Sequence, residues 1–452
     1  MGSITLGQAA QWCGGKIDPK YADITFLGAN NDSRIIQPGQ LFVALQGERD
    51  GHDFIPMALA KGAAAVLCTR CDGEYPAIVV DDTRIALGDL AREERKRLGM
   101  KVVGVTGSVG KSTTKEMIAT VLASRYRVEK TPVNHNNDIG MPMAVLSMPE
   151  ETQIAVLEMG MNHFREIAYL ASIAQPDVAV IINIGTMHIE HLGSQEGILK
   201  AKLEILEGMK EEGKVILNGD DQLLWNVRKT GVNAAYFGVR NPECQVLGSN
   251  VCEADGKLSF DFAYSGQTHA VALALEGEHY VSDALAAISV GLSFGIDAQT
   301  IGRALSDFRN MAGRQEIFEH NGYTIIKDCY NAGPESMAAA LTVLGNRQGR
   351  RIAVLGDMLE LGMCAPAEHY RVGRIAAEKA DIVFAYGPNS ARVASGALTG
   401  GMPNARTEAF EDRDALVDAL KRVVKPGDVL LFKGSHGMHM ELALEKLIAK
   451  ES

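Results

Sequence analysis

The sequence predicts an α/β protein of three domains: a small α/β N-terminal domain, a central domain built on a parallel sheet, and a Rossmann-like, doubly wound C-terminal domain. Two observations indicate this. Continuous apolar runs, typical of buried parallel strands, alternate with helical stretches from Lys101 onward. The alternation begins afresh near Gly313. The 452 residues suffice for about two to four domains, and we place their boundaries at 1–83, 84–312 and 313–452.

The N-terminal domain is expected from short β-like runs separated by turn residues, such as QLFVAL and AIVVDD. Residues 84–99, RIALGDLAREERKRLG, have the pattern of an amphipathic helix that connects this domain to the next.

In the central domain, the runs KVVGVTG, IAVLEMG and DVAVIINIG predict strands, and they alternate with helices expected at 111–124, 164–174 and 195–208. A β-rich insertion is expected around 233–275, followed by a helix at 279–295. In the C-terminal domain the runs YTIIKD, RIAVLGD, ADIVFAYG and DVLLFKGS are each followed by a helical segment. Ligands of such sheets bind beyond the carboxyl ends of the strands, so the residues there are the candidates for function.

Composition narrows the class of protein. A hydrophobic content of 46% and a charged content of 22% are typical of a soluble globular chain. The net charge of −11 argues against non-specific binding of nucleic acid. No apolar stretch approaches the roughly 18 residues of a membrane span, and no signal peptide is evident. Seven cysteines without regular spacing indicate a reducing, cytoplasmic setting. We expect a cytoplasmic monomer.

A phosphate-binding loop is predicted at Gly107–Thr113, GSVGKST, because it follows an apolar strand and opens a helix. The N–H groups of such a turn bind phosphate oxygens. Lys111 adds a cation for the β- and γ-phosphates, and Ser112 offers a hydroxyl to Mg²⁺. Val105 occupies the place of the first Gly in the general P-loop pattern. The contacting residues, Gly107, Ser108, Val109, Gly110, Lys111, Ser112 and Thr113, remain in place.

Three further segments could take part in metal chemistry. Glu158 ends a buried strand, where a carboxylate needs a cation or hydrogen-bond donors, and Mg²⁺ is a natural partner. His188 and His191 have a spacing that could hold a metal, although such pairs are often plain loop residues. Lys202 lies close to an apolar helical stripe, where it is either buried or extended to solvent.

Polar residues follow other strands. The segment TPVNHNNDIGMP suits either a loop that binds polar ligand groups or an ordinary turn. In the C-terminal domain, polar side chains near strand ends could face the central domain. The candidates are Asn134, Asn136, Asn137, Arg314, Asp328, Tyr330 and Asn331.

These motifs, in this order, resemble the Mur ligases, ATP-dependent amide-bond ligases of peptidoglycan precursor synthesis. The resemblance spans essentially the whole chain and includes TGSVGKS at 106–112, NHNNDIG at 134–140, EMG at 158–160 and AKLEI at 201–205. It implies a central P-loop ATPase domain. It also explains Val105, because family loops are of the form G-x-x-G-K-[ST].

The resemblance implies a role for each candidate residue. Lys111 and Ser112 would bind the phosphates of ATP and Mg²⁺, Glu158 would bind Mg²⁺, and His188 a second Mg²⁺. Lys202 matches the lysine that is carbamylated in the family. Arg314 and Asp328 would complete the ATP site from the C-terminal domain. The uridine end of a UDP-sugar would lie in the N-terminal domain, near Ser33, Arg34, Asp50, Gly51 and His52.

Within the family, the segments at 328–337 and 356–362 are similar to the branch that adds D-alanyl-D-alanine to a UDP-N-acetylmuramoyl-tripeptide. Tyr330 and Asn331 would then contact the acceptor dipeptide. Three alternatives remain: a Mur-type ligase adding the third peptide residue, a folylpolyglutamate-type ligase, and a P-loop NTPase without ligase activity. The D-[ND]-P-R motif usual in the first alternative is missing from the sequence.

One segment departs from the family. Where H-N-x-x-N-A-L-A-A is common, the chain has HYVSDALAA, with Tyr280 and Asp283 replacing two Asn expected near the adenine. We hypothesise that an ionised Asp283 accepts a hydrogen bond from adenine N6 and so favours ATP over GTP. The alternative is that the helix only packs at this position.

Overall fold

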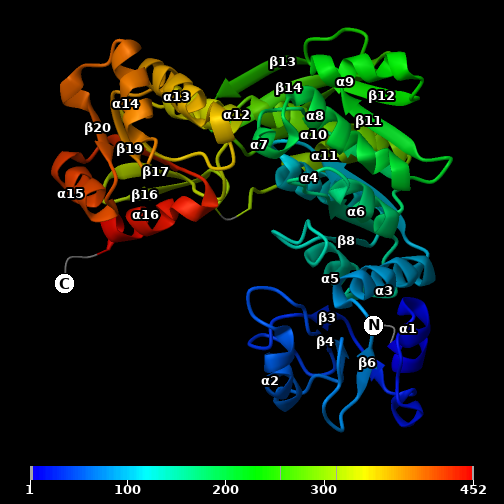
Figure 1. Cartoon of the computed structure of the whole chain (residues 1–452). Helices are drawn as coiled ribbons and strands as arrows, with labels where there is room; N and C mark the ends of the chain where they lie inside the picture. The colour runs from blue at the N-terminus through cyan, green and yellow to red at the C-terminus, as the bar shows by residue number, and fades with distance from the viewer. Residues whose placement is uncertain (1–3, 255, 312, 450–452) are drawn as a thin grey trace.

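Three sheets follow one another along the chain in the computed structural model, which describes residues 4–254, 256–311 and 313–449. In Figure 1 the N-terminal region, in blue, and the C-terminal region, in orange and red, each contact the middle region, in cyan and green. The predicted α/β class is confirmed. No described helix has the length and apolar character needed to cross a membrane.

The N-terminal region is a parallel four-stranded sheet in the order β3-β4-β5-β6, beside a short antiparallel pair, β1 and β2. Two helices pack with them. The bounds are β1 (Ile4–Thr5), α1 (Leu6–Cys13), β2 (Thr25–Phe26), β3 (Ala29–Asn30), β4 (Leu41–Val43), α2 (Ile55–Ala60), β5 (Ala65–Cys68) and β6 (Ala77–Val79).

The predicted connecting helix is α3 (Thr83–Leu98). It begins where the Asp82 carboxylate accepts hydrogen bonds from the N–H groups of Arg84 and Ile85. It ends at Gly99, whose φ of 63° suits a glycine C-cap. Leu87 and Leu90 of α3 are buried in a core shared by the N-terminal and middle regions, so this helix joins the two.

The middle region is a nine-stranded sheet in the order β15-β14-β13-β12-β11-β10-β7-β9-β8. From β8 to β13 the strands are parallel. The segment expected as an insertion instead extends this sheet, because β13 pairs in parallel with β12 and then forms antiparallel pairs with β14 and β15. The bounds are β7 (Lys101–Thr106), β8 (Val128–Lys130), β9 (Ile154–Glu158), β10 (Val178–Ile181), β11 (Lys214–Asn218), β12 (Ala234–Gly238), β13 (Val246–Ala254), β14 (Lys257–Tyr264) and β15 (Gln267–Leu273).

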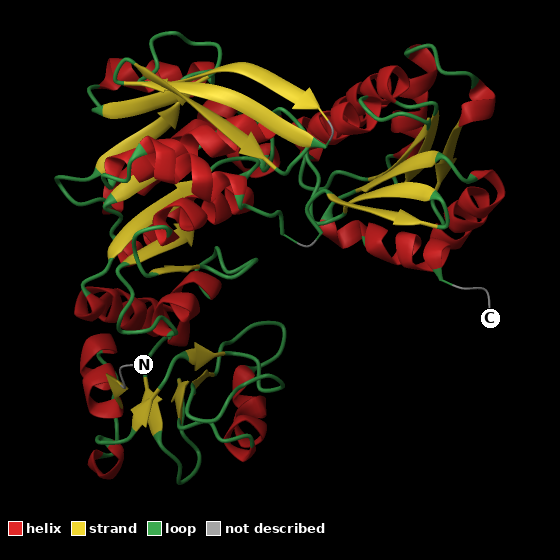
Figure 2. Ribbon diagram, turned by 180° about the vertical axis from the view of Figure 1, so that it is seen from behind, coloured by secondary structure: helices red, strands yellow, loops and turns green. Residues whose placement is uncertain are grey.

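Helices cover both faces of this sheet, as Figure 2 shows. The helices α4 and α10 pack against each other on one face, and α3, α5 and α6 lie on the other. The segment expected to be helical at 195–208 is α8 followed by a 3₁₀ turn at Glu204–Gly208. The bounds are α4 (Lys111–Ala123), α5 (Gly140–Leu146), α6 (Glu166–Ala174), α7 (Ile189–Leu192), α8 (Gln195–Leu203), α9 (Gln222–Asn226), α10 (His279–Ser293) and α11 (Ala298–Ser306).

The C-terminal region is a six-stranded sheet in the order β16-β17-β21-β18-β19-β20, parallel except for β16. Residues of α12 to α14 pack on one face and residues of α15 and α16 on the other, which is the doubly wound arrangement expected. The bounds are β16 (Glu316–His320), β17 (Tyr323–Asp328), α12 (Pro334–Gly345), β18 (Arg350–Gly356), α13 (Ala365–Lys379), β19 (Ile382–Tyr386), α14 (Ser390–Thr399), β20 (Thr407–Phe410), α15 (Arg413–Val423), β21 (Asp428–Lys433) and α16 (Met440–Ile448).

Asp177 fixes the amino end of the central strands. Its carboxylate accepts a hydrogen bond from the N–H of Val102 and lies 2.9 to 3.3 Å from the cationic nitrogens of Arg95, Lys101 and Lys210. Burial alone would raise the pKa of Asp177, but the hydrogen bonds from Lys210, Val102 and Lys101 outweigh it and hold the pKa below its usual value.

We expect Asp177→Asn to lower the thermal unfolding midpoint at pH 7 by about 5 °C, because three cations lose their shared partner. A depressed native pKa stabilises the fold above the unfolded pKa of about 3.9, and this stabilisation is lost as the pH falls through the native value. The difference from wild type should therefore persist at pH 5 and shrink below about pH 4. Calorimetry across pH measures this difference in unfolding midpoint.

Asp414→Asn, which breaks an exposed ion pair with Lys446, is the matched control and should have little effect. Equal midpoints for wild type and Asp177→Asn at pH 7 would contradict the assignment.

Candidate active site

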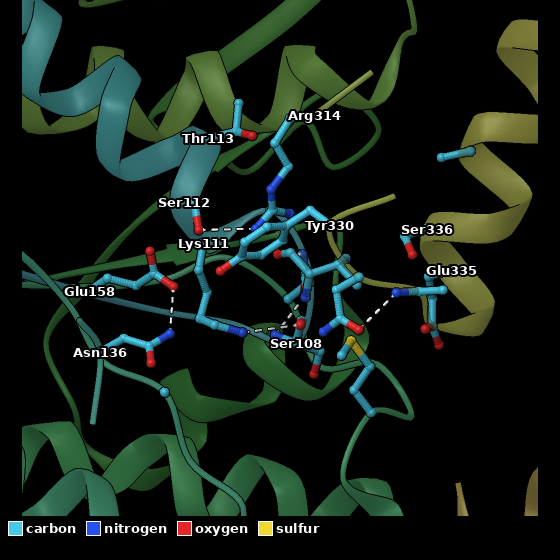
Figure 3. A pocket seen from close by; sticks show the side chains of 18 of the residues that line it. Ser108, Lys111, Ser112, Thr113, Asn136, Glu158, Arg314, Tyr330, Glu335 and Ser336 are labelled. Atoms are coloured by element: carbon cyan, nitrogen blue, oxygen red, sulfur yellow. Dashed lines mark hydrogen bonds between the residues drawn. The ribbon is translucent and has the colours of Figure 1, made fainter. Parts of the chain in front are cut away.

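A cavity of about 570 Å³ lies between the middle and C-terminal regions, at the carboxyl ends of strands from both sheets. From the middle region it is lined by the phosphate loop, the loop at 134–137 and Glu158. From the C-terminal side it is lined by the segments around Arg314, Asp328 and Glu335. Figure 3 shows Lys111 and Ser112 on one side, with Arg314 and Tyr330 extending toward them.

The predicted phosphate loop connects β7 to α4. Gly110 has φ of 81°, a conformation that favours glycine, and it directly precedes the first turn of α4. Asn183, which follows β10, fixes the loop. Its amide oxygen accepts hydrogen bonds from the N–H groups of Ser108 and Val109, and its amide nitrogen donates to the carbonyl of Val109. The Ser108 hydroxyl accepts a hydrogen bond from the N–H of Gly185.

Two lysines with lowered pKa values lie at or near the site, Lys111 partly buried and Lys202 buried. Lys111 donates to the carbonyl of Gly107 at 2.9 Å, and burial lowers the pKa of Lys111 while the Glu158 carboxylate opposes that shift. Lys202, on α8, is 2% exposed, which settles the choice between burial and extension to solvent in favour of burial. Burial, and secondarily the charge of Lys111, lower the pKa of Lys202 well below its usual value. Lys202 does not itself line the cavity.

Glu158 ends β9 and is 3% exposed. One carboxylate oxygen accepts a hydrogen bond of 2.8 Å from the Asn136 amide, whereas the other is buried without a hydrogen-bond partner among the described residues. A buried carboxylate oxygen left in this way fits a Mg²⁺ ligand. No group of three or more His, Cys, Asp or Glu within the described residues is arranged to hold a metal. This is compatible with Mg²⁺, because protein sites commonly supply one or two carboxylates and the phosphates supply further ligands.

His188 lines the cavity. Its φ of 65° is uncommon for a residue other than glycine and persists where the surrounding structure imposes it. Its Nδ1 is 2.8 Å from the Glu360 carboxylate of the C-terminal region, an ion-pair contact whose angle is not that of a hydrogen bond. The imidazole lowers the pKa of Glu360. His191 instead stacks with His163, at 4.5 Å between ring centroids.

Arg314 joins the two regions. Its guanidinium donates to the Ser112 hydroxyl at 3.2 Å and lies 3.7 Å from the centre of the Tyr330 ring. The Tyr330 hydroxyl donates in turn to the amide oxygen of Asn134 (Figure 3 shows Tyr330 beside Arg314). On α12, Glu335 accepts hydrogen bonds from the N–H and hydroxyl of Thr186. These contacts bind the C-terminal region to the phosphate-loop side.

Asp328, at the end of β17, accepts a hydrogen bond of 2.6 Å from Lys433, which is 2% exposed and ends β21. Lys433 also donates to the carbonyl of Asn331. Asn137 also lines the cavity, and its amide oxygen accepts hydrogen bonds from the N–H groups of Ile139 and Gly140, so it fixes the start of α5.

The residues predicted to hold a uridine lie apart from this cavity, in the N-terminal region. His52 is buried, its Nδ1 lies 2.6 Å from Asp50, and its Nε2 accepts from the N–H of Thr69. A side chain on Gly51 would meet the carbonyl of Leu45, so glycine is needed there. Ser33 is buried against Met57, whereas Arg34 is exposed and paired with Asp32. The polar atoms of His52 and Ser33 are therefore engaged within the protein. These two residues shape the surface rather than offer free groups to a ligand.

Asp283 lines the cavity, but it is not a free hydrogen-bond acceptor. It is buried, accepts a hydrogen bond of 2.8 Å from the Thr114 hydroxyl, and lies where a side chain on Gly110 would touch it. The carboxylate lines the cavity, and these contacts hold it against the phosphate loop. Burial raises the pKa of Asp283 to about 7, although the Thr114 hydrogen bond opposes this. The Tyr280 hydroxyl is likewise engaged, since it accepts a hydrogen bond from Asn310.

This geometry predicts a pH effect on nucleotide binding. With a pKa of about 7, Asp283 gains its negative charge as the pH rises from 6 to 8. A carboxylate behind a phosphate loop disfavours an anionic ligand, so the KM for ATP should rise over that interval. In Asp283→Asn this component of the rise should be absent, and the preference for ATP over GTP should stay unchanged. Steady-state kinetics with both nucleotides from pH 6 to 8 measure both effects. A changed ATP/GTP ratio would favour direct base contact instead.

Several residues of the site escaped sequence reasoning, among them Asn183, Lys433 and Glu335. Asn183 and Lys433 follow strand runs in INIG and LFKGS, so their position at strand ends was the available signal. Glu335, in the first turn of α12, has no such signal, because its partner Thr186 is 149 residues away.

Three models of known protein families match successive parts of the chain. The Mur ligase middle domain model matches residues 105–291, the model described as "Mur ligase, glutamate ligase domain" matches 313–436, and the model described as "Mur ligase family, catalytic domain" matches 23–102.

Individual relatives match over nearly their full length. The UDP-N-acetylmuramoyl-tripeptide--D-alanyl-D-alanine ligase of Bacillus subtilis is 41% identical over 440 residues, which cover 95% of each chain. A crystal structure of MurF from Acinetobacter baumannii superimposes with a TM-score of 0.91 at 32% identity and covers 99% of both chains. The MurF ligase of Thermotoga maritima in complex with ADP gives 0.83 at 30% identity, covering 93% of this chain and 97% of that one.

Proposed function

The chain belongs to the Mur ligase family, and we propose that the cavity between its middle and C-terminal regions is where it joins D-alanyl-D-alanine to UDP-N-acetylmuramoyl-tripeptide with the use of ATP. This is a step of peptidoglycan precursor synthesis. The observation that supports the placement best is the contact between Arg314 and Ser112, because it brings the C-terminal region to the phosphate loop.

The reaction proceeds through an acyl phosphate. A carboxylate oxygen of the tripeptide attacks the γ-phosphorus of ATP, and ADP leaves. The amine of D-alanyl-D-alanine then attacks the acyl carbon, and the tetrahedral intermediate releases inorganic phosphate and forms the amide bond. No side chain needs to act as a nucleophile, so the protein contributes binding, orientation and electrostatic stabilisation.

The chain's own cations and donors perform these tasks. The N–H groups of Ser108 and Val109 are held by Asn183, so those at the start of α4, from Gly110 onward, would bind phosphate oxygens. The Lys111 ammonium would offset charge at the transferred phosphate. Mg²⁺, when bound, would offset the repulsion between phosphates and carboxylate. Ser112 and Glu158 would hold one ion and His188 a second, and a carbamate on Lys202 would orient Mg²⁺ or its water ligands.

The C-terminal region protects the acyl phosphate from water. The contact between Tyr330 and Asn134, and that between Glu335 and Thr186, link the two regions beside the cavity, where closure would exclude water. Tyr330 and Asn331 line it where an acceptor dipeptide could be oriented.

Phosphate release tests this function. Release should require ATP, D-alanyl-D-alanine and a UDP-N-acetylmuramoyl-tripeptide together, and single D-alanine should be a poor acceptor. Parallel assays with tripeptides ending in meso-diaminopimelate and in L-lysine would identify the third residue. Turnover that does not depend on the dipeptide would contradict the assignment.

Lys111→Ala should reduce kcat by about 100-fold or more, because the transferred phosphate loses its nearest mobile cation. Lys200→Ala, which removes an exposed lysine of α8 beside Phe164, is the matched control and should keep full activity. Ligation by Lys111→Ala within a few-fold of wild type would rule out the phosphate-loop role.

Lys202 should carry a carbamate. A lysine reacts with CO₂ only in its neutral form, and the lowered pKa of Lys202 favours that form near neutral pH. Protein equilibrated with ¹³C-bicarbonate should show a carbamate carbon signal by NMR that is present in Lys200→Ala and absent in Lys202→Ala. Lys202→Ala should be nearly inactive and partly restored by acetate. A spectrum identical for wild type and Lys202→Ala would refute the modification.

A further inference from the structure

The second lysine of the phosphate-loop helix is buried and has no part in the mechanism above. Lys115 lies one turn after Lys111 on α4, its side chain is 0% exposed, and it does not line the cavity. Burying an ammonium group costs several kcal/mol unless charged or polar partners compensate it. A lysine kept in such a position therefore points to a specific set of partners.

The partners of Lys115 lead to Glu158. The ammonium donates a hydrogen bond of 2.7 Å to the carbonyl of Thr131, and lies 3.3 Å from Glu116 and 3.9 Å from Oε2 of Glu158. The hydroxyl of the same Thr131 accepts a hydrogen bond of 3.0 Å from the N–H of Glu158. One residue thus ties together the lysine and the carboxylate.

The two oxygens of Glu158 have different environments. Oε1 accepts from the Asn136 amide, which fixes that side of the carboxylate (Figure 3). Oε2 has no hydrogen-bond partner among the described residues, and the ammonium of Lys115 lies just beyond hydrogen-bond distance from it. The carboxylate is therefore held between an amide on one side and a buried cation on the other, and its plane is set before any metal arrives.

Resting on the Mg²⁺ site proposed at Glu158, we propose that Lys115 is a positioning residue that holds the Glu158 carboxylate in place for that ion. Mg²⁺ demands near-ideal octahedral geometry, so a carboxylate ligand that is free to turn binds it less well. Groups that orient a metal ligand commonly change metal affinity by roughly 10- to 100-fold when they are removed.

Two variants separate this role from plain packing. Lys115→Met keeps the length of the side chain and removes the charge, whereas Lys115→Gln also keeps a donor for the Thr131 carbonyl. Glu116→Gln is the matched control, because Glu116 also contacts Lys115 but pairs in addition with Lys130 rather than with Glu158. Thermal unfolding verifies that each variant folds.

The probe is Mn²⁺, followed by the electron paramagnetic resonance signal of the free ion. Protein saturated with the β,γ-methylene analogue of ATP is titrated, with the analogue alone as the baseline. We expect Lys115→Met and Lys115→Gln to weaken Mn²⁺ binding by about tenfold or more and Glu116→Gln to leave it unchanged. In turnover assays the two Lys115 variants should need more Mg²⁺ and recover most of kcat when it saturates.

An unchanged Mn²⁺ dissociation constant in folded Lys115→Gln or Lys115→Met would overturn the role of Lys115 and leave the metal site intact. If the wild-type protein binds no more Mn²⁺ than the analogue alone does, the metal site is overturned and the inference with it. A variant that loses stability but keeps its Mn²⁺ affinity would show that Lys115 serves packing alone, which also contradicts the proposal.

Discussion

The site depends on buried positive charge placed around a small cavity. A polyphosphate and a carboxylate must meet there, and their repulsion grows as water is removed. The chain answers this with cations fixed by the fold: Lys111 at the start of α4, Arg314 from the C-terminal region and Lys115 beside Glu158. Each is held by a carbonyl, a hydroxyl or a carboxylate or packed into the interior, so little reorganisation is needed when the anions arrive.

The same constraint explains why two sheets share the site. Parallel strands bring their carboxyl ends to one edge, and the middle sheet places the phosphate loop, Glu158 and Asn183 there. Without the second sheet, this edge would be open to water. The second sheet presents its own carboxyl edge, with Asp328 and Lys433, across the cavity. Contacts between side chains of the two regions, such as Arg314 with Ser112, then make the geometry at the phosphate loop depend on how the regions are seated.

The sequence predicted the parts of this site that are local. The fold class and the phosphate loop follow from apolar periodicity and from one contiguous motif, and Glu158 follows from its place at the end of a strand. Contacts between distant residues could not be predicted, since Tyr330 and Asn134 are 196 positions apart. Asp283 shows a different limit: its residue type suggested a hydrogen-bond acceptor for a base, but the sequence could not show its burial, its bond to Thr114 or its raised pKa. The β-rich segment after β12 was recognised as strands, although only the pairing of Phe237 with Val246 shows that it continues the central sheet.

The central claim is that the nucleotide site is completed by the C-terminal region through Arg314. Calorimetric titration of ATP with Mg²⁺ into Arg314→Ala tests it most directly. Arg309→Ala is the control, since Arg309 also lies between α11 and β16 and, among the described residues, its hydrogen bonds go to the carbonyls of Ser306 and Phe308. The account predicts that Arg314→Ala binds ATP about tenfold more weakly, a loss of about 1.4 kcal/mol, while Arg309→Ala binds like wild type. Equal affinity for wild type and Arg314→Ala would contradict it.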